Sequence, residues 1–356
     1  MRNFRLLLLA VAVAVGSCTE DEGDREQMVN LQEVKDDPAV QLTNLNAAIE
    51  RSRRDGSLYA RRAVALLRTG KLEQALEDAE QAVQFTKNDP YAMFVKAQAL
   101  RALGRQEEAL PLALQAERNA YQTSSLYVLL GELYLQRKEY EQARRYLQKA
   151  QELAPTDEFA FYYKGRVQEA TGDTANAMNN YRLALQQSSG FMEPQRELAA
   201  ILVSRGDYAE AKPYLFKAQR LAAKDYKLLY NQGLVYEAEQ KQDSAMWAFN
   251  KALSINDTLS GAHYRLGFYQ HKLGNNEEAL AHLLKAYSKY KNKPEYLTKL
   301  ASAYERTGRT RDALTTYQRL VAVEPRYTYG YQAIARLKYR LAKPTPDSAA
   351  VRLQEY

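Results

Sequence analysis

The chain has 356 residues, of which 46% are hydrophobic and 26% are charged. This balance is typical of a folded protein and excludes an intrinsically disordered chain, while 16 Gly and 10 Pro are too few for a loop-rich all-β protein. The net charge of +7 is mild and scattered along the sequence, which permits anionic partners but predicts no nucleic acid binding.

Residues 1–17 form a predicted targeting segment. Arg2 and Arg5 give it a positive start, and residues 6–15 form an apolar core that is too short to span a bilayer as a permanent helix. Small residues follow, directly before Cys18, which is the only cysteine in the chain. This pattern resembles the lipobox of bacterial lipoprotein signal peptides. The resemblance implies cleavage before Cys18 and lipidation of its thiol, whereas an ordinary secretory signal with a chance cysteine is the alternative.

Residues 18–37 form a predicted tether that begins with an acidic run at residues 19–24. The run resembles the export signal of Bacteroidota lipoproteins, which directs them to the outer face of the outer membrane. A solvated spacer that keeps the folded body away from the membrane is the alternative. We therefore expect a protein of the bacterial outer membrane, anchored through lipid at Cys18 and exposed to the periplasm or to the cell surface.

Residues 56–327 contain eight consecutive copies of one pattern, all of the same length, and residues 38–55 resemble half of such a repeat. The predicted repeats span 56–89, 90–123, 124–157, 158–191, 192–225, 226–259, 260–293 and 294–327. One alanine marks each of them: Ala75, Ala109, Ala143, Ala177, Ala211, Ala245, Ala279 and Ala313. Earlier in each repeat, at a fixed distance from this alanine, stands a small residue: Ala63, Ala97, Gly131, Gly165, Ala199, Gly233, Gly267 and Ala301. Several coupled columns at one fixed period indicate a repeated structural unit.

The spacing of apolar residues predicts two short amphipathic helices in each unit. The small residues allow the two helices to approach closely, since a larger side chain would separate their axes. Six repeats carry a glycine between the helices, which suits a left-handed residue after the first helix: Gly70, Gly104, Gly172, Gly206, Gly274 and Gly308. One hairpin cannot bury its apolar face alone, so neighbouring hairpins must stack.

Two further columns identify the family that this pattern resembles. A large residue precedes the small one in most repeats: Tyr59, Met93, Tyr127, Phe161, Leu229 and Leu297, with departures at Gln195 and His263. A leucine or aromatic residue follows in the second helix: Leu147, Tyr181, Leu215, Phe249, Leu283 and Tyr317, with Ala79 and Ala113 in the first two repeats. These columns resemble the tetratricopeptide repeat. The resemblance implies an all-α, right-handed solenoid of eight hairpins in one array without an internal domain boundary. Residues 328–342 are the expected capping helix and residues 343–356 a tail.

The sequence contains no pattern that predicts an enzyme, a cofactor or a metal site. His263, His271 and His282 lie in one repeat, but their spacing matches no metal-binding motif. Phosphate-binding loops, dinucleotide-binding glycine motifs and nucleophile elbows are missing from the sequence. We therefore expect a binding protein.

The resemblance also implies that the first helices line a concave groove, into which positions 2, 5, 9 and 12 of each repeat point. In repeats four to seven these positions and their neighbours carry aromatic and arginine side chains, the residue types that anchor protein interfaces. The candidate partner-binding residues are Phe159, Tyr162, Arg166, Arg196, Tyr230, Asn231, Tyr264, Arg265 and Phe268. The alternative is that several of these rings pack between adjacent hairpins.

Together these features predict a lipid-anchored scaffold or adaptor of the cell envelope that holds protein or peptide partners. One alternative is a glycan-binding component of a carbohydrate-handling or export system, because tyrosine-rich surfaces also stack sugars. Another is a structural subunit that associates with itself through the open ends of the solenoid.

The predicted anchor depends on one atom, the sulfur of Cys18. Cys18→Ala should abolish acylation and leave the protein either uncleaved or free in the periplasm. Membrane fractionation with metabolic labelling by a fatty acid checks this outcome. Normal processing and membrane retention of the variant would exclude the lipoprotein interpretation.

Overall fold

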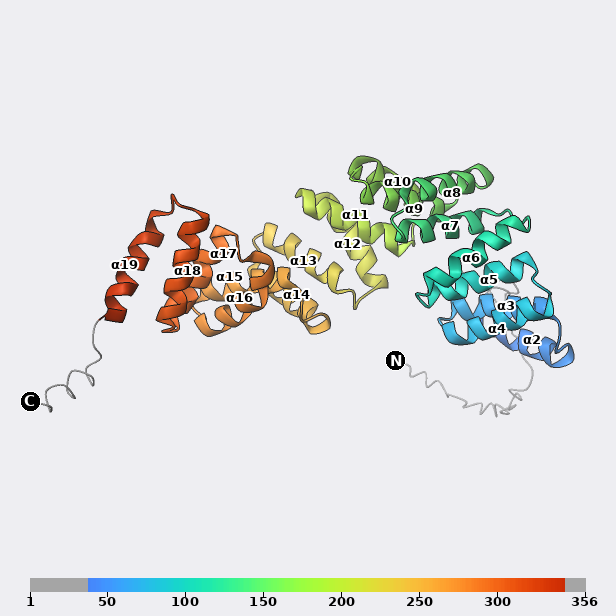
Figure 1. Ribbon diagram of the computed structural model, residues 1–356, viewed down its shortest axis with the longest axis horizontal. Coiled ribbons are helices and arrows are strands. Elements are labelled where there is room, and N and C mark those ends of the chain that lie inside the picture. The colour runs from blue at the N-terminus through green and yellow to red at the C-terminus, as the bar shows by residue number, and fades with distance from the viewer. Residues whose placement is uncertain (1–37, 343–356) are drawn as a thin grey trace, which may run out of the picture. The chain divides into compact units, whose positions relative to one another are not determined.

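The computed structural model describes residues 38–342, which form α-helices joined by short turns, without a strand in that range (Figure 1). The predicted signal peptide (1–17), the tether with Cys18 (18–37) and the tail (343–356) lie outside the described residues. Among the described helices none is both long enough and apolar enough to cross a membrane.

The described helices divide after Ala120 into two compact units. The first unit contains five helices: α2 (Pro38–Arg51), α3 (Gly56–Arg68), α4 (Leu72–Phe85), α5 (Pro90–Ala102) and α6 (Gln106–Arg118). Each helix packs on the next, and α3 also contacts α5. Arg62 joins three of these helices, because its guanidinium donates to both carboxylate oxygens of Asp78 on α4 and to Asn46 on α2.

The second unit begins at Tyr121 and contains the remaining thirteen described helices. Their bounds are α7 (Ser124–Gln136), α8 (Tyr140–Leu153), α9 (Glu158–Ala170), α10 (Thr174–Gln187), α11 (Met192–Arg205), α12 (Tyr208–Leu221), α13 (Tyr226–Ala238), α14 (Gln242–Ile255), α15 (Ser260–Leu273), α16 (Asn276–Tyr290), α17 (Pro294–Arg306), α18 (Thr310–Val323) and α19 (Thr328–Ala342). Consecutive helices pack against one another through the unit. The predicted all-α fold of stacked hairpins is confirmed within each unit, but the division between the second and third repeats was not predicted.

The two helices of each hairpin meet at the predicted small residue. A Cβ atom placed on Gly233 would lie 2.4 Å from Cε1 of Phe249, and one on Gly165 would lie 2.6 Å from Cε1 of Tyr181. Gly131 and Gly267 meet Leu147 and Leu283 in the same way, at 2.6 and 2.8 Å from Cγ. Real Cβ atoms do not approach other atoms so closely, so at these four contacts glycine makes room for the side chain of the second helix. Repeats five and eight carry alanine at the equivalent position, with Leu215 and Tyr317 as the partners.

The turn between the two helices has the left-handed conformation expected from its glycines. All six turn glycines have φ between 73° and 86°. The two repeats that lack glycine there place Lys138 and Gln240 in the same conformation, with φ of 61° and 59°. The conformation is therefore a property of the hairpin, and glycine is the residue that adopts it with least strain.

First helices begin with a capping side chain in several repeats. Asp89, Thr123 and Asp157 each accept a hydrogen bond from a backbone N–H in the first turn of the following helix. Such caps satisfy donors that have no partner inside the helix and contribute about 1 kcal/mol each. They fix where each first helix starts, and therefore which of its residues turn toward the second helix.

The contact between Gly233 and Phe249 predicts the effect of one added methyl group. Gly233→Ala should lower the free energy of unfolding by roughly 1 to 3 kcal/mol, because overpacking outweighs the better helix propensity of alanine. Chemical denaturation followed by circular dichroism measures the change.

Gly190→Ala is the matched control, because no atom lies within 4 Å of a Cβ at this position and its φ is not positive. Its effect should stay within about 0.5 kcal/mol. Phe249→Leu should partly rescue Gly233→Ala, since it recreates the alanine and leucine pair of Ala199 and Leu215. Equal stability of the two single variants would contradict the proposed contact.

Candidate functional site

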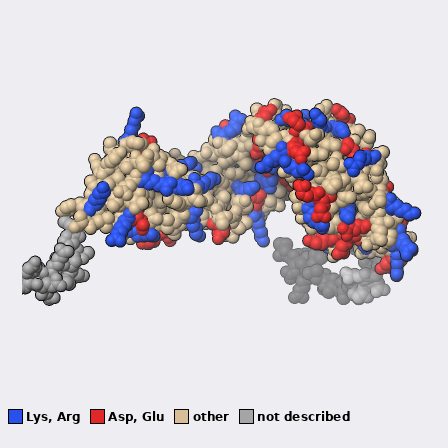
Figure 2. All heavy atoms as spheres, viewed as in Figure 1, with Lys and Arg blue, Asp and Glu red and all other residues tan. Residues whose placement is uncertain are grey.

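The candidate partner-binding residues lie on α9, α11, α13 and α15, the first helices of repeats four to seven, all within the second unit. We call the side chains at positions 2, 5, 9 and 12 of these helices, together with their polar neighbours, the first-helix face. Charged groups of both signs are interspersed on the face of the protein visible in Figure 2. On the first-helix face, too, positively and negatively charged side chains lie next to one another.

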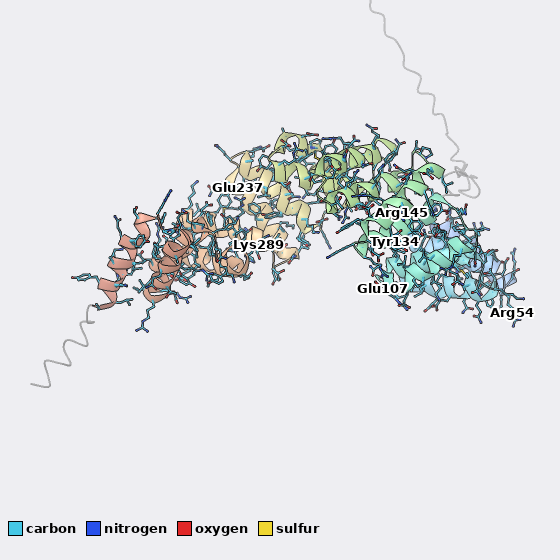
Figure 3. The ribbon with its side chains drawn as sticks, turned by 45° about the horizontal axis from the view of Figure 1, so that its top comes forward. Arg54, Glu107, Tyr134, Arg145, Glu237 and Lys289 are labelled. Atoms are coloured by element: carbon cyan, nitrogen blue, oxygen red, sulfur yellow. The ribbon has the colours of Figure 1, made fainter. Side chains whose placement is uncertain are left out.

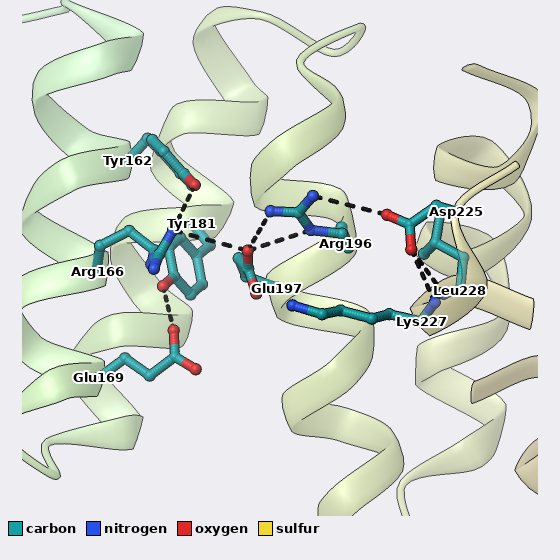
Figure 4. A network of polar contacts seen from close by, with 9 residues as sticks. All are labelled: Tyr162, Arg166, Glu169, Tyr181, Arg196, Glu197, Asp225, Lys227 and Leu228. Carbon is teal, nitrogen blue, oxygen red and sulfur yellow. Dashed lines mark hydrogen bonds and ion pairs between the residues drawn. The ribbon is translucent and has the colours of Figure 1, made fainter. Parts of the chain in front are cut away.

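A chain of polar contacts runs from α9 to the start of α13 (Figure 4). Arg166 Nη1 donates to the Tyr162 hydroxyl at 2.9 Å and lies 3.8 Å from Oε1 of Glu197 on α11. Glu197 in turn accepts from Nη2 of Arg196 at 2.6 Å. Arg196 continues the chain, with Nη1 3.6 Å from Oδ2 of Asp225. Side chains thereby join three successive first helices.

Asp225 combines two roles in this chain of contacts. Its Oδ1 accepts hydrogen bonds from the backbone N–H groups of Lys227 and Leu228 at 2.8 and 3.3 Å, which caps α13, while its Oδ2 faces Arg196. A carboxylate at a helix N-terminus is favoured by the helix dipole. The position of Arg196 therefore depends on where α13 begins.

A second polar cluster joins α13 to α15. Glu237, labelled in Figure 3, accepts from the Tyr269 hydroxyl at 3.2 Å and lies 3.2 Å from Nη1 of Arg265. The Arg265 guanidinium also stands 5.5 Å from the centre of the Tyr264 ring. Burial, with a smaller contribution from the nearby Glu237 carboxylate, raises the pKa of Tyr269, so its hydroxyl remains a donor at neutral pH.

Two of the candidate rings belong to the core. Tyr162 is only 4% exposed and contacts the rings of Tyr163, Tyr181 and Phe191, with centroids 4.9 to 5.9 Å apart. Tyr264 is 8% exposed, with its ring stacked 4.4 Å from that of Tyr290. Each ring also shares a core cluster with the next hairpin, Tyr162 with Leu198 and Tyr264 with Leu297. Both rings therefore pack between neighbouring hairpins, as the alternative interpretation held, and present little surface to a partner.

Tyr230 and Phe268 are intermediate cases. The Tyr230 ring covers Gly261 of the next first helix, where a Cβ atom would lie 2.7 Å from the Tyr230 hydroxyl oxygen. Phe268 is partly buried against Tyr264 and lies under the ammonium group of Lys299. Asn231 is also partly buried. Tyr230 and Phe268 thus join neighbouring repeats, and all three residues leave only part of their surface to solvent.

The accessible part of the first-helix face is centred on α9. Phe159 is 49% exposed, with its ring 4.9 Å from that of Phe191, and the Arg166 side chain is 40% exposed. Phe159 and Arg166 are separated by about two helical turns and therefore share one side of the helix. The structure thus brings an exposed ring and a held guanidinium to the same surface.

The acidic partners Glu197, Asp225 and Glu237 were not predicted from the sequence. Each stands nearly one repeat away from its arginine in the sequence, on the neighbouring first helix or at its start. A search for opposite charges about one repeat apart on first helices would have found them. Their presence means that the arginines of this face are neutralised in pairs.

The three histidines of repeat seven occupy different sites. Nδ1 of His263 lies 2.8 Å from Nδ1 of His282, and Nε2 of His263 lies 2.8 Å from the backbone oxygen of Asp257. His271 contacts Ser302 instead. Within residues 38–342 no group of three or more metal-binding side chains comes together.

The contact between the two Nδ1 atoms requires at least one of the rings to be neutral, and at neutral pH both rings are. The Asp257 oxygen can only accept, so Nε2 of His263 carries the proton, Nδ1 of His263 accepts, and Nδ1 of His282 donates. Burial lowers the pKa of both rings, and together with the repulsion from His263 it brings the pKa of His282 to about 4. The positive charge of Lys285 also lowers the pKa of both rings. The backbone oxygen and the charge of Asp257 act in the opposite direction and raise the pKa of His263.

Comparison with known proteins identifies the repeats. Family models described as tetratricopeptide repeat match residues 90–115, 124–157, 226–258, 260–288 and 295–326. The matched segments fall in repeats of both units. They include the whole of α13 and α15, two helices of the first-helix face.

Curated relatives are distant and longer. The BBSome complex member BBS4 of Bos taurus is 24% identical over 276 residues, which are 77% of this chain and 53% of that protein. The TPR repeat-containing protein MJ1428 of Methanocaldococcus jannaschii is 23% identical and aligns with 78% of this chain and 46% of its own length. The chain therefore spans about half the length of these relatives.

Solved structures share the fold. The APC/C hetero-tetramer Cut9-Hcn1 matches 85% of this chain and 60% of its own with a TM-score of 0.57 and 18% identity. The structure of pilF from Pseudomonas aeruginosa matches 62% of this chain and 97% of its own with a TM-score of 0.51 and 22% identity. At these identities the likeness extends to the fold alone.

The histidine pair predicts a pH dependence of stability. In the unfolded chain both rings titrate at about pH 6.5, while in the folded protein they take up protons at lower pH. The unfolded state thus binds more protons between these values, and stability should fall as the pH decreases from about 6.5 toward 4. Urea unfolding at pH 7 and at pH 4.5 measures the loss.

Carboxylates also titrate in this range, so a matched variant is needed to isolate the histidines. His282→Asn keeps a donor for His263 and copies Asn180, which occupies the same position in repeat four. The stability of this variant should depend less steeply on pH between 6.5 and 4.5. If the variant and the wild type lose stability equally between pH 6.5 and 4.5, the histidine pair does not titrate as described.

Proposed function

This chain belongs to the tetratricopeptide repeat family, whose fold is a general scaffold for protein–protein interaction, and from that premise we propose that it is a lipid-anchored adaptor of a bacterial cell envelope. In this proposal the protein binds a protein or peptide on its first-helix face. Its role is not catalytic, because the repeats take up residues 56–327 and their polar groups mainly pair with one another.

One observation carries the assignment of the binding face. Arg166 is held by Tyr162 yet remains 40% exposed, on the same side of α9 as the exposed ring of Phe159, about two helical turns away. A guanidinium has five N–H donors, and only one of those in Arg166 is used by Tyr162. A partner carboxylate or backbone carbonyl can accept from the others without the entropic cost of first ordering the side chain. The neighbouring ring supplies apolar contact area.

The envelope location rests on the sequence before residue 38. A positively charged start, a short apolar core and a single cysteine at position 18 favour an acylated anchor. The acidic run at residues 19–24 favours transport to the outer membrane. An adaptor anchored in this way binds its partner close to the membrane surface.

The glycan-binding alternative receives less support from the first-helix face. Sugars stack on exposed ring faces, whereas Tyr162 and Tyr264 are buried and Tyr230 covers Gly261. Among the candidate aromatic residues, Phe159 alone is exposed rather than buried or partly buried. A single exposed ring next to an arginine fits a peptide better than an extended glycan.

The proposal predicts separate effects on binding and on folding. Phe159→Ala and Arg166→Ala should each weaken capture of the native partner by about 1 to 3 kcal/mol, the range of interface anchors. Both side chains are substantially exposed, so melting curves should stay close to those of the wild type. Capture of the partner from detergent-solubilised envelope, at several bait concentrations, measures binding. Thermal melting followed by circular dichroism measures folding.

Arg182→Ala serves as the control. It also removes a partly exposed arginine with an acidic partner, Glu210, but from the second helix of repeat four. Its binding should equal that of the wild type. If Phe159→Ala and Arg166→Ala fold and bind normally, the partner does not use this face and the proposal fails.

A further inference from the structure

The second helices of repeats six to eight, α14, α16 and α18, expose large apolar side chains. Trp247 is 55% exposed, Leu284 40% and Tyr287 36%. On their other side the same helices bury the residues of the hairpin contact, such as Phe249 and Leu283. The exposed residues therefore point away from the first helices and form an apolar surface that meets solvent, as interaction surfaces do.

Lysines lie beside these apolar side chains. Lys251 follows Trp247 by four residues, so the two share one side of α14. Lys285 directly follows Leu284 on α16, and both lysines are exposed. Apolar and positively charged groups thus alternate on the same surface.

An arginine adds a third positive charge and connects two of the helices. The Arg319 guanidinium on α18 lies 5.7 Å from the centre of the Tyr287 ring on α16. It donates to the Tyr287 hydroxyl at 2.7 Å and to the Asn292 side-chain oxygen at 2.8 Å. These neutral partners order the guanidinium without cancelling its charge. We call this surface the outer patch, defined as Trp247, Lys251, Leu284, Lys285, Tyr287 and Arg319.

The parts of the three helices that carry the outer patch contain no acidic residue. Residues 247–255, 281–290 and 315–323 include neither Asp nor Glu. Acidic residues stand only in the first turns of these helices and in the turns after α14 and α18: Asp243, Glu277, Glu278, Asp312, Asp257 and Glu324. The charge along the patch itself is therefore positive.

The residue types favour a lipid surface over a protein as the occupant. Lysine is depleted from protein–protein interfaces, where its long side chain has to be ordered. At an anionic membrane each lysine or arginine strengthens binding about fivefold, and the side chain can keep its charge in water while its stem lies on apolar surface. Tryptophan and tyrosine are enriched at the level of the headgroups, because their rings are apolar and their polar atoms stay hydrated.

We propose that the outer patch lies on an anionic membrane surface. Trp247, Leu284 and Tyr287 enter the headgroup layer, while Lys251 and Lys285 meet lipid phosphates. The first-helix face belongs to the other helix of each hairpin and stays available to a protein partner. This inference concerns a contact of the folded repeats and does not depend on the anchor at Cys18.

Trp247 is the only tryptophan of the chain, so its fluorescence reports directly on the patch. The test uses the full chain with Cys18→Ser, in which the proposed lipid anchor cannot form. Vesicles with equal amounts of phosphatidylcholine and phosphatidylglycerol should shift the Trp247 emission to shorter wavelength, and brominated acyl chains in them should quench it. Vesicles of phosphatidylcholine alone should require at least about tenfold more lipid, because they lack the negative charge.

Two double variants separate the patch from general attraction between charges. Lys251→Gln with Lys285→Gln should raise the lipid concentration at half-maximal shift at least about tenfold, from about fivefold for each charge. Lys224→Gln with Lys227→Gln is the matched control, because it removes the same charge from exposed lysines at the start of α13. The control should leave the lipid requirement nearly unchanged, and circular dichroism should show both variants folded.

Three results would overturn the proposal. The first is an equal lipid requirement of the two double variants. The second is a Trp247 that stays as open to iodide as in free solution while the chain sediments with the vesicles, since residues outside the patch would then hold the chain there. The third is shielding of Trp247 that grows with protein concentration without lipid, which would identify a second copy as the occupant. None of these results bears on the acylation of Cys18.

Discussion

Each hairpin of this protein closes on a contact between one small residue of the first helix and one residue at a fixed later position on the second. Where the first member is glycine, as in Gly165 and Gly233, the second is large and its ring lies over the glycine. Where the first member is alanine, as in Ala63 and Ala97, the second is also alanine in the first unit. In the second unit Ala199 and Ala301 stand instead opposite Leu215 and Tyr317. Each hairpin thus combines a small residue on the first helix with a partner of variable size on the second, and this contact determines how closely the two helices approach.

Features that depend on local sequence were predictable because their cause lies inside one repeat. The constant repeat period, the small residues at the helix contact and the left-handed turn glycines all follow from short-range geometry. Lys138 and Gln240 show the limit of that reasoning, since they adopt the turn conformation without being glycine. Their conformation is imposed by the hairpin on either side, which no single residue encodes.

The candidate site was predicted less completely because its properties arise between repeats. Position five of a repeat identified Tyr162 and Tyr264, but whether a ring lines a surface or fills the space between hairpins depends on its neighbours. Phe191 and Tyr290, at the ends of the same repeats, cover these rings. The next repeat adds Leu198 beside Tyr162 and Tyr296 beside Tyr264, and none of these four residues stands at one of the four groove positions. The acidic partners of the arginines were missed for the same reason. As a result, Phe159 and Arg166 remain as the accessible part of a face that otherwise joins one hairpin to the next.

The pairing of small and large residues within one hairpin also bears on how such an array can grow. Gly233 and Phe249 lie within the same repeat, so a duplication of one whole repeat that begins at a repeat boundary copies both members together. The new hairpin then carries its own matched pair, and no compensating change is needed in the older ones. A duplication that begins within a hairpin, between the two members, would instead combine a glycine from one unit with a side chain from another. Array length is therefore free to change in whole hairpins, whereas exchange of half a hairpin is restricted to units whose pairs match in size.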